Sequence, residues 1–426
     1  GQVIIDGQNQ NEIGGRIPAP PIYILGSDIS THSDSTLRYL ALADGKINAG
    51  DTSIIEYNWT GLTEDGESVY YIDGNPQLSN GAGINVGGDD NTVRYNVAAS
   101  ARGVSIDIDG SDNVVIGNFV GTNAQGTIPD VPAHRRCHAD ARFSNWFTGN
   151  GIVVHSAANR NQIGGPSAAE RNVIAGMLSA SESPNETPPV AIDIRGDQTL
   201  VQNNYIGMDV NGKELWTCGK GVVNFNGKFN QFKDNAIVNT GMAALTIDCS
   251  YISLDAITMQ GNVIKNAPTA LAFGSGVPDD WTDFNPAQIT SLDGTAVSGS
   301  NGADSPCANC VVELFLDDGD DLVEALQALI TTTADADGNW TTTLPSALAD
   351  GEGLHTASTT ADWDQIASFN DGTTSKFSDL YPSDVTPPDP TPEPTLPPPE
   401  TVSTTAPVTA PELPPTYTTV ITVTSA

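Results

Sequence analysis

Aspartates inside short apolar runs are the first residues of this sequence that could do chemistry. Asp107 and Asp109 lie in Ser-Ile-Asp-Ile-Asp, Asp193 lies in Ala-Ile-Asp-Ile, and Asp248 ends Leu-Thr-Ile-Asp. The similar contexts predict that Asp109, Asp193 and Asp248 line one face over successive repeats. Two carboxylates at a suitable separation can act as general acid and base on a glycosidic bond. The alternative is a row of solvated carboxylates. We assign no catalytic residue, because no Gly-His-Gly and no Arg/Lys-rich stretch accompanies the row.

Acidic turns are candidates for a hard cation, since carboxylate oxygens are the ligands that Ca²⁺ prefers. Neither Asp107–Asp112 nor Asp335–Asn339 is followed by the glutamate that an EF-hand loop requires, and residues 317–321 are a denser acidic turn. We therefore expect no required cofactor and treat calcium as an optional ligand. The candidate ligands are Asp107, Asp109, Asp112, Asp317, Asp318, Asp320, Asp335 and Asp337.

The five cysteines allow either metal binding or disulfides. Cys307 and Cys310 form Cys-Ala-Asn-Cys, a zinc half-site or a short-loop disulfide, and the lack of a second such pair favours the disulfide. Cys137 and Cys218 lie in or near excursions from the repeats and form a second candidate disulfide. Cys249 is then the odd cysteine, expected to be a buried thiol.

Charge and composition restrict the partners and the compartment. The chain carries 52 acidic and 17 basic residues, a net charge of −35, so a phosphate backbone would be repelled and nucleic acid is excluded as a partner. The acidity favours either solubility or cation binding. No apolar run reaches the roughly 20 residues of a membrane span. A start at Gly1 and a Thr/Pro-rich tail predict a processed chain outside the cell, at the cell surface.

A repeated sequence pattern occupies the first two thirds of the chain: an apolar run, Asn or Gly, an apolar pair and Gly. Its asparagines are about 22, 54, 32, 31 and 27 residues apart, and we interpret the gap of 54 as two turns of about 27. This period predicts a solenoid of stacked short strands, with asparagine ladders at the corners. The asparagines are Asn96, Asn118, Asn172, Asn204, Asn235 and Asn262.

Two motifs resemble a known family. Asn11–Gly15 and Asn161–Gly165 read Asn-x-Ile-Gly-Gly, and Asn118–Gly126 and Asn204–Gly212 form a related turn. They resemble secreted bacterial proteins with right-handed parallel β-helix repeats. The resemblance implies an all-β, right-handed parallel β-helix over residues 1–280. It implies no single activity, because this fold hosts lyases, hydrolases, adhesins and fibres.

Two insertions interrupt the repeats, at residues 127–148 and 179–189. Insertions in solenoids emerge on one side and often bind something. The first contains His134, Cys137 and His138, which form either a metal cluster or a loop packed on the solenoid.

The remaining chain changes character three times. About seven short strands over residues 285–381 predict a β-sandwich, and Ala336–Trp340 resembles bacterial immunoglobulin-like modules. Residues 382–415 are rich in Pro and Thr and predict an extended linker. Residues 416–426 predict a terminal strand that pairs with another subunit.

These features favour an extracellular structural protein that polymerises with itself into a filament, fibre or sheath. Its inter-subunit strand uses Tyr417, Val420, Ile421 and Val423. One alternative is a polysaccharide lyase or glycoside hydrolase of the β-helix type, which Asp193→Ala or Asp248→Ala would inactivate. The other is a cell-surface adhesin that binds glycans through the insertions.

Overall fold

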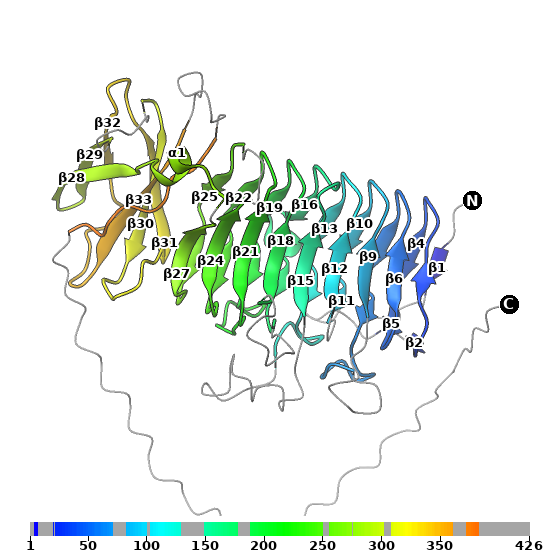
Figure 1. Cartoon of the computed structure of the whole chain (residues 1–426). Helices are drawn as coiled ribbons and strands as arrows, with labels where there is room; N and C mark the ends of the chain where they lie inside the picture. The colour runs from blue at the N-terminus through cyan, green and yellow to red at the C-terminus, as the bar shows by residue number, and fades with distance from the viewer. Residues whose placement is uncertain are drawn as a thin grey trace, which may run out of the picture.

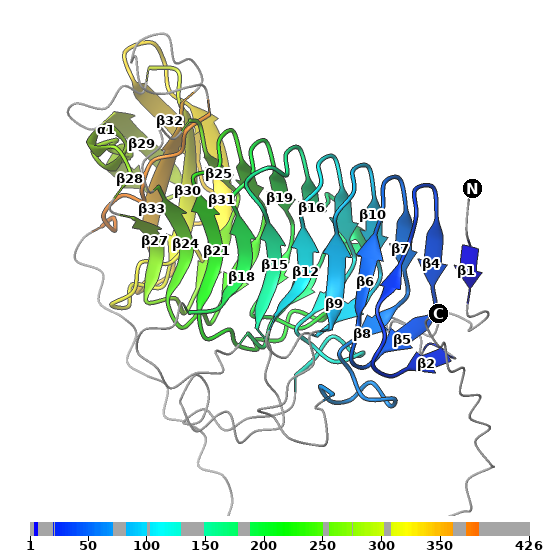
Figure 2. The same ribbon diagram turned by 45° about the vertical axis from the view of Figure 1, so that its right-hand side comes forward.

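The computed structural model describes residues 4–6, 20, 22–70, 82–99, 103–128, 149–177, 188–249, 255–274, 276–301, 308–360 and 372–382. Figures 1 and 2 show a long stack of short strands that ends against a second, smaller β-domain. Helices are short: the described residues form a 3-10 turn at Ala168–Glu170 and α1 at Asp279–Thr282. No helix among them is long and apolar enough to cross a membrane.

The stack consists of three nine-stranded parallel sheets. Sheet A contains β1 (Ile4–Asp6), β4 (Thr36–Arg38), β7 (Ile54–Glu56), β10 (Thr92–Arg94), β13 (Val114–Ile116), β16 (Gln162–Gly164), β19 (Leu200–Gln202), β22 (Gln231–Lys233) and β25 (Thr258–Gln260). Sheet B contains β2 (Ile22–Ile24), β5 (Leu40–Leu42), β8 (Trp59–Thr60), β11 (Val97–Ala98), β14 (Phe119–Val120), β17 (Val173–Ile174), β20 (Tyr205–Ile206), β23 (Ala236–Val238) and β26 (Val263–Lys265). Sheet C contains β3 (Ile29–Ser30), β6 (Lys46–Ala49), β9 (Gly83–Val86), β12 (Val104–Ile108), β15 (Asn150–Val154), β18 (Val190–Ile194), β21 (Lys220–Phe225), β24 (Ala243–Asp248) and β27 (Thr269–Phe273). Each strand pairs with the strand three places along the chain, so the architecture is a parallel β-helix, as expected.

Alternation with period two builds the core. In sheet A the central residues of the strands from β4 onward point inward, so Ile55, Val115 and Ile163 are completely buried. Each unit is too small to bury this apolar side alone, and stacking joins the units into one continuous core.

Asparagines form a ladder at the corner between sheets A and B. Each side-chain Nδ2 donates to the Oδ1 of the next asparagine at 2.9–3.0 Å, through the rungs Asn58, Asn96, Asn118, Asn172, Asn204, Asn235 and Asn262. All seven side chains are at most 3% exposed. The six predicted asparagines are therefore confirmed as ladder residues, and Asn58 adds a seventh. Because a buried amide is costly without partners, this ladder restrains the stacking register.

One step of the predicted period is wrong. Asn118 and Asn172 are neighbours in the ladder, and Phe119 of β14 pairs directly with Val173 of β17. The 54 residues between the two asparagines are therefore a single repeat enlarged by an insertion, rather than two turns.

The second domain consists of two three-stranded antiparallel sheets. One contains β28 (Ala287–Asp293), β29 (Ala296–Asn301) and β32 (Asn339–Thr343). The other contains β31 (Gln327–Thr333), β30 (Val311–Asp317) and β33 (Gly353–Thr359). Trp340, Val312, Leu314 and Leu354 fill the space between the sheets, which form a β-sandwich. The described part of this domain contains six strands, where about seven were predicted, and residues 372–382 run along β33 through isolated bridges and single hydrogen bonds.

Residues 383–426 lie outside the described part of the chain. The predictions for the Pro/Thr-rich linker at 382–415 and for the terminal strand at 416–426 therefore stay predictions.

Candidate functional site

The outer face of sheet C carries the aspartates singled out in the sequence, but in a different register. Asp107 of β12 and Asp193 of β18 both align with Val153 of β15. With one strand between them, their Cα atoms are about 10 Å apart. The next row along these strands contains Asp109, His155 and Arg195, since His155 and Arg195 continue the ladder past Ile108 and Val154.

Asp109, Asp193 and Asp248 therefore lie on one face, as expected, but Asp193 stands in a different row from the other two. Asp107, and not Asp109, is level with Asp193, and Asp248 aligns with Phe225 of β21. A sequence motif of alternating Ile and Asp contains two outward positions, and only the pairing register decides which of them meets the next strand.

Two charge pairs occupy this face. The His155 Nε2 lies 2.7 Å from the Asp107 Oδ1 and 3.8 Å from the Asp109 Oδ1. The Arg195 guanidinium donates to the Asp193 Oδ2 through Nη2 at 2.7 Å and Nε at 3.1 Å. This hydrogen bond raises the pKa of Arg195 above its usual range.

The Asp193 carboxylate is the most unusual group on the face. Asp193 is 5% exposed, and its second oxygen, Oδ1, has no hydrogen-bond partner among the described residues. A buried, unpartnered carboxylate oxygen is costly unless something else satisfies it. Asp248 differs, because its Oδ1 accepts a hydrogen bond from the Cys249 amide at 2.8 Å. The arrangement offers one strong acceptor beside a fixed guanidinium and an imidazole.

The two insertions enter sheet C next to these residues. The first joins β14 to β15, which precedes His155, and the second joins β17 to β18, which contains Asp193. Most of both insertions, including His134, Cys137 and His138, lies outside the described residues.

Most of the predicted calcium ligands hydrogen-bond or pair with other groups of the protein. Asp112 pairs with Arg160, and Asp335 accepts hydrogen bonds from the amides of Asp337 and Asn339. Asp318 and Asp320 accept amides within their own turn. No group of three His, Cys, Asp or Glu side chains that could hold a metal occurs among the described residues. Calcium binding stays an untested expectation.

Asp317 is the most enclosed of these acids. It is completely buried, and its Oδ2 lies 3.0 Å from the His355 Nε2. Burial raises its pKa, but hydrogen bonds from His355 and from the amides of Glu324 and Gly319 outweigh burial and hold the pKa below its usual range. Asp317 therefore organises the turn that leads to Glu324.

The predicted disulfides include Cys137 and Cys307, which lie outside the described residues, so both pairings stay predictions. Cys249 is a buried thiol, 2% exposed, as expected.

The two ends of the β-helix form a second candidate site, for assembly. We call the outer edges of β25, β26 and β27 the C-terminal rim, and those of β1, β2 and β3 the N-terminal rim. The sandwich covers the C-terminal rim. Four rim amides donate to it: Met259 to the Thr374 Oγ1 at 2.8 Å, Gly261 to the Glu313 Oε1 at 3.0 Å, Ile264 to the Ala325 carbonyl at 2.9 Å and Asn266 to the Glu324 Oε1 at 2.6 Å.

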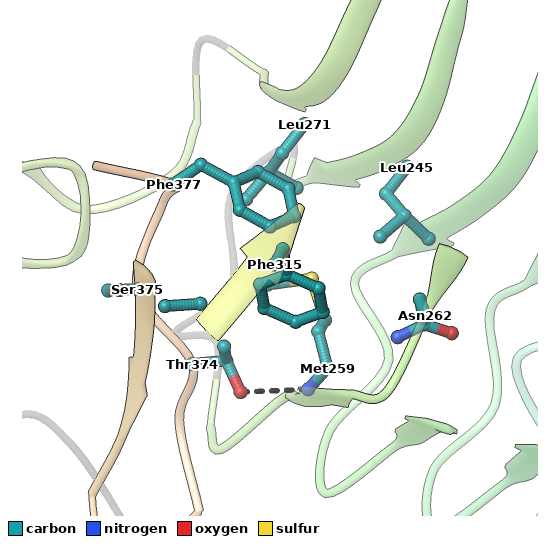
Figure 3. A pocket seen from close by; sticks show the side chains of 9 residues that line it. Leu245, Met259, Asn262, Leu271, Phe315, Thr374, Ser375 and Phe377 are labelled. Carbon is teal, nitrogen blue, oxygen red and sulfur yellow. Dashed lines mark hydrogen bonds between the residues drawn. The ribbon is translucent and has the colours of Figure 1, made fainter. Parts of the chain in front are cut away.

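An apolar plug accompanies these caps. Figure 3 shows Phe315 and Phe377 lying over Met259 and Leu271 at the end of the β-helix core, with the Thr374 hydroxyl bonded to the Met259 amide. The rings of Phe315 and Phe377 meet edge to face at 5.4 Å, and Phe315 is 2% exposed. The sandwich therefore caps the C-terminal rim along β25 and β26, while β27 pairs only with β24 among the described residues and stays partly exposed.

The N-terminal rim has no such cover in the described part of the chain. β1, β2 and β3 each end their sheet, with a strand partner on one side only. Figure 1 shows these blue strands at the far end of the stack from the sandwich.

Comparison with known proteins gives little beyond the fold. No family model and no curated protein sequence matches the chain. Similar solved structures include tailspike protein 2 of Escherichia coli O157:H7 bacteriophage CAB120 (8% identity, TM-score 0.30, 79% of this chain and 56% of that one). A Geobacillus virus E2 protein (11%, 0.26, 84% and 68%) and the tailspike of E. coli bacteriophage HK620 in complex with a pentasaccharide (12%, 0.18, 76% and 64%) are also similar. This chain spans just over half the length of the first tailspike, and scores this low transfer no function to it.

Proposed function

We propose that this chain is an extracellular structural protein, a subunit of a self-assembling surface filament, fibre or sheath. Neighbouring copies are joined by β-strand addition of residues 416–426. The observation that carries the proposal is the difference between the rims: the sandwich caps four amides of the C-terminal rim, while β1, β2 and β3 lack a second strand partner in the described chain.

The capped rim restricts how copies can join. Exposed strand edges are templates for pairing with another chain. Because the sandwich occupies the C-terminal rim, β-helices cannot stack directly rim to rim at that end. A contact through the tail avoids this obstacle.

Charge also favours the tail. At a net charge of −35, copies repel one another on close approach. Residues 416–426 contain no charged side chain, and Tyr417, Val420, Ile421 and Val423 favour strand. The 34-residue linker at 382–415 contains 13 prolines, and at about 3.1 Å per residue it spans on the order of 100 Å. The tail is thus long enough to reach a second copy.

The remaining predictions accompany this role. They are a right-handed sense of the β-helix, an immunoglobulin-like classification of the sandwich, Thr glycosylation of the linker and the disulfides Cys137–Cys218 and Cys307–Cys310. Disulfides and a glycosylated Pro/Thr-rich linker suit a protein outside the cell.

Deletion of residues 383–426 tests the proposal. We expect the full chain to form polymers in negative-stain micrographs and in sedimentation velocity, and the truncated chain to sediment as a monomer with unchanged far-UV circular dichroism. Ile421→Pro, which blocks strand formation, should reproduce the deletion, and Thr404→Pro in the linker is the matched control. Polymers of undiminished length after the deletion would refute strand addition by the tail.

A second candidate function, binding or hydrolysis of a glycan, is favoured by the unpartnered Asp193 Oδ1. A carboxylate beside a fixed guanidinium can bind sugar hydroxyls, and the acidity of the chain favours a neutral glycan. Asp193→Asn should then abolish glycan binding or polysaccharide cleavage. Asp248→Asn should not have this effect, because the Asp248 Oδ1 already accepts a hydrogen bond from the Cys249 amide. Equal activity of both variants would exclude this site.

A further inference from the structure

β31 is an open edge strand of the sandwich. Its backbone pairs with β30 on one side, and its backbone amides and carbonyls make no other hydrogen bond to the described part of the chain. One side-chain hydrogen bond, from the Thr332 Oγ1 to the Thr341 carbonyl of β32 at 3.2 Å, joins it to the other sheet. Its sequence, Gln-Ala-Leu-Ile-Thr-Thr-Thr, contains neither a charge nor a proline, and Gln327, Ala328, Thr331 and Thr333 are exposed. Charges and prolines are the usual devices that prevent an edge strand from pairing with another chain. β31 lacks both.

The other described edges are shorter, charged or partly covered. Strands of the N-terminal rim are two or three residues long. β28 ends in Asp293, and the hydroxyls of Ser358 and Thr356 bond the amide and carbonyl of Ala287 at its start. β32 has five residues against the seven of β31. β31 is therefore the longest uncharged edge that the described chain presents.

We infer that β31 accepts residues 416–424 of a second copy of this chain as an added strand. The inference rests on the proposed function, which did not say which strand the tail of a neighbouring copy pairs with, and it names β31 as that strand. The donated strand extends the sheet β31–β30–β33 by one strand.

Length and pattern fit this occupant. Nine residues of Thr-Tyr-Thr-Thr-Val-Ile-Thr-Val-Thr cover the seven of β31. In a strand, Tyr417, Ile421 and Val423 point to one face. Leu329 and Ile330 of β31 pack against the sandwich core, so the apolar face of the added strand has a place beside them.

Charge fits as well. The turns that flank β31 are acidic, with Asp320 and Asp321 before it and Asp335 and Asp337 after it. In a chain of net charge −35, most segments would be repelled there, whereas residues 416–424 are uncharged.

A second copy is favoured over the chain's own tail. The described chain ends where Tyr381 pairs with Leu354 of β33, at the opposite edge of the same sheet from β31. From there a linker with 13 prolines in 34 residues favours an extended conformation, which leads the tail away from its own sandwich.

The test uses two double variants of the full chain. Gln327→Lys with Thr333→Lys places charges at both ends of the β31 edge. Asn339→Lys with Thr343→Lys places the same charges at exposed positions of β32 and is the matched control. Polymer content is measured by sedimentation velocity, and amide exchange of residues 327–333 by hydrogen–deuterium exchange.

We expect assembly to slow exchange of residues 327–333 at least tenfold. The β31 variant should lose both this protection and the polymers, and the β32 variant should keep both. Polymers that survive in the β31 variant would overturn the acceptor, while the proposed function stands if deletion of 383–426 still removes them. If residues 327–333 exchange at least tenfold more slowly in dilute monomers of the full chain than in the chain lacking 383–426, the chain's own tail is bound, which would overturn the second copy.

Discussion

The two ends of the β-helix differ in how the backbone amides and carbonyls of their last strands are paired. At the C-terminal rim, four amides donate to a hydroxyl, a carbonyl and two carboxylates of the sandwich. At the N-terminal rim, β1, β2 and β3 end their sheets without a further partner among the described residues. Sealing a rim requires the burial of polar caps, and Glu313 and Glu324 are only 5% and 1% exposed. A solenoid therefore closes an end at an electrostatic cost.

The largest effect on this comparison should come from Phe315, the centre of the plug. Phe315→Ala removes a ring that is 2% exposed and leaves a cavity over Met259, which should lower the free energy of unfolding by about 3–5 kcal/mol. Urea denaturation measures the loss, and faster amide exchange at residues 258–266 would show that the rim has opened.

Phe229 offers a matched control, since its ring is 41% exposed and Phe229→Ala should cost little. A loss below about 1 kcal/mol for Phe315→Ala would mean that the plug does not hold the sandwich on the rim.

A somewhat smaller effect is expected in the middle of the asparagine ladder. Asn172→Ala leaves the Asn118 amide and its Nδ2 group without their shared acceptor, deep in the corner. We expect a loss of about 2–4 kcal/mol in urea denaturation. Asn211, which is exposed, is the control. Equal stability of the two variants would show that the ladder contributes no more than surface asparagines.

The pH dependence of the sealed end comes next. Burial raises the pKa of Glu313 to about 7; the Gly261 amide opposes this shift, Asp234 adds to it and Lys233 opposes it. An acid whose pKa is higher in the folded state contributes stability that is fully present below its unfolded pKa of about 4.5 and is lost as the pH rises through 7. Unfolding at pH 5 and pH 8 should therefore differ, with Glu313 contributing about 2–3 kcal/mol.

Glu313→Gln keeps an acceptor for the Gly261 amide and should flatten this dependence. Some slope should remain, because burial also raises the pKa of Glu324. An unchanged slope in the variant would locate the titrating group elsewhere. Asp317 does not confuse the measurement: its pKa is lowered, so its contribution is lost only as the pH falls below its usual range.

Sequence alone could predict the repeating parts of this molecule but not the contacts between distant parts. One asparagine per repeat predicts a ladder, because a buried amide must find the same partner in every coil. The gap of 54 residues could not be divided correctly, since an insertion and an extra turn have the same length.

The rim caps were also beyond prediction. Gly261 and its cap Glu313 are 52 residues apart, and Met259 and Thr374 are 115 residues apart. Neither pair has a spacing that recurs, so no pattern signals it. The sequence also could not predict that the Asp193 Oδ1 lacks a partner among the described residues, because the groups around it come from three different repeats.

The smallest effect is expected near the N-terminal rim, where tyrosines stack on the surface. Tyr57 lies between Tyr39 and Tyr95, with ring centroids 5.3 and 5.4 Å away, and has a backbone φ of +56°. Stacking contributes about 0.5–1.5 kcal/mol, whereas the left-handed backbone costs a side chain about 1 kcal/mol. Tyr57→Gly loses the stacking energy but also removes the backbone strain, so the free energy of unfolding of this variant should stay within about 0.5 kcal/mol of that of the parent. Tyr57→Ala loses the stack and keeps the strain, and should be about 1 kcal/mol less stable in urea denaturation. If the two variants are equally unstable, the stack holds this end more firmly than its exposure suggests, and the contrast with the sealed rim is smaller than the hydrogen bonds indicate.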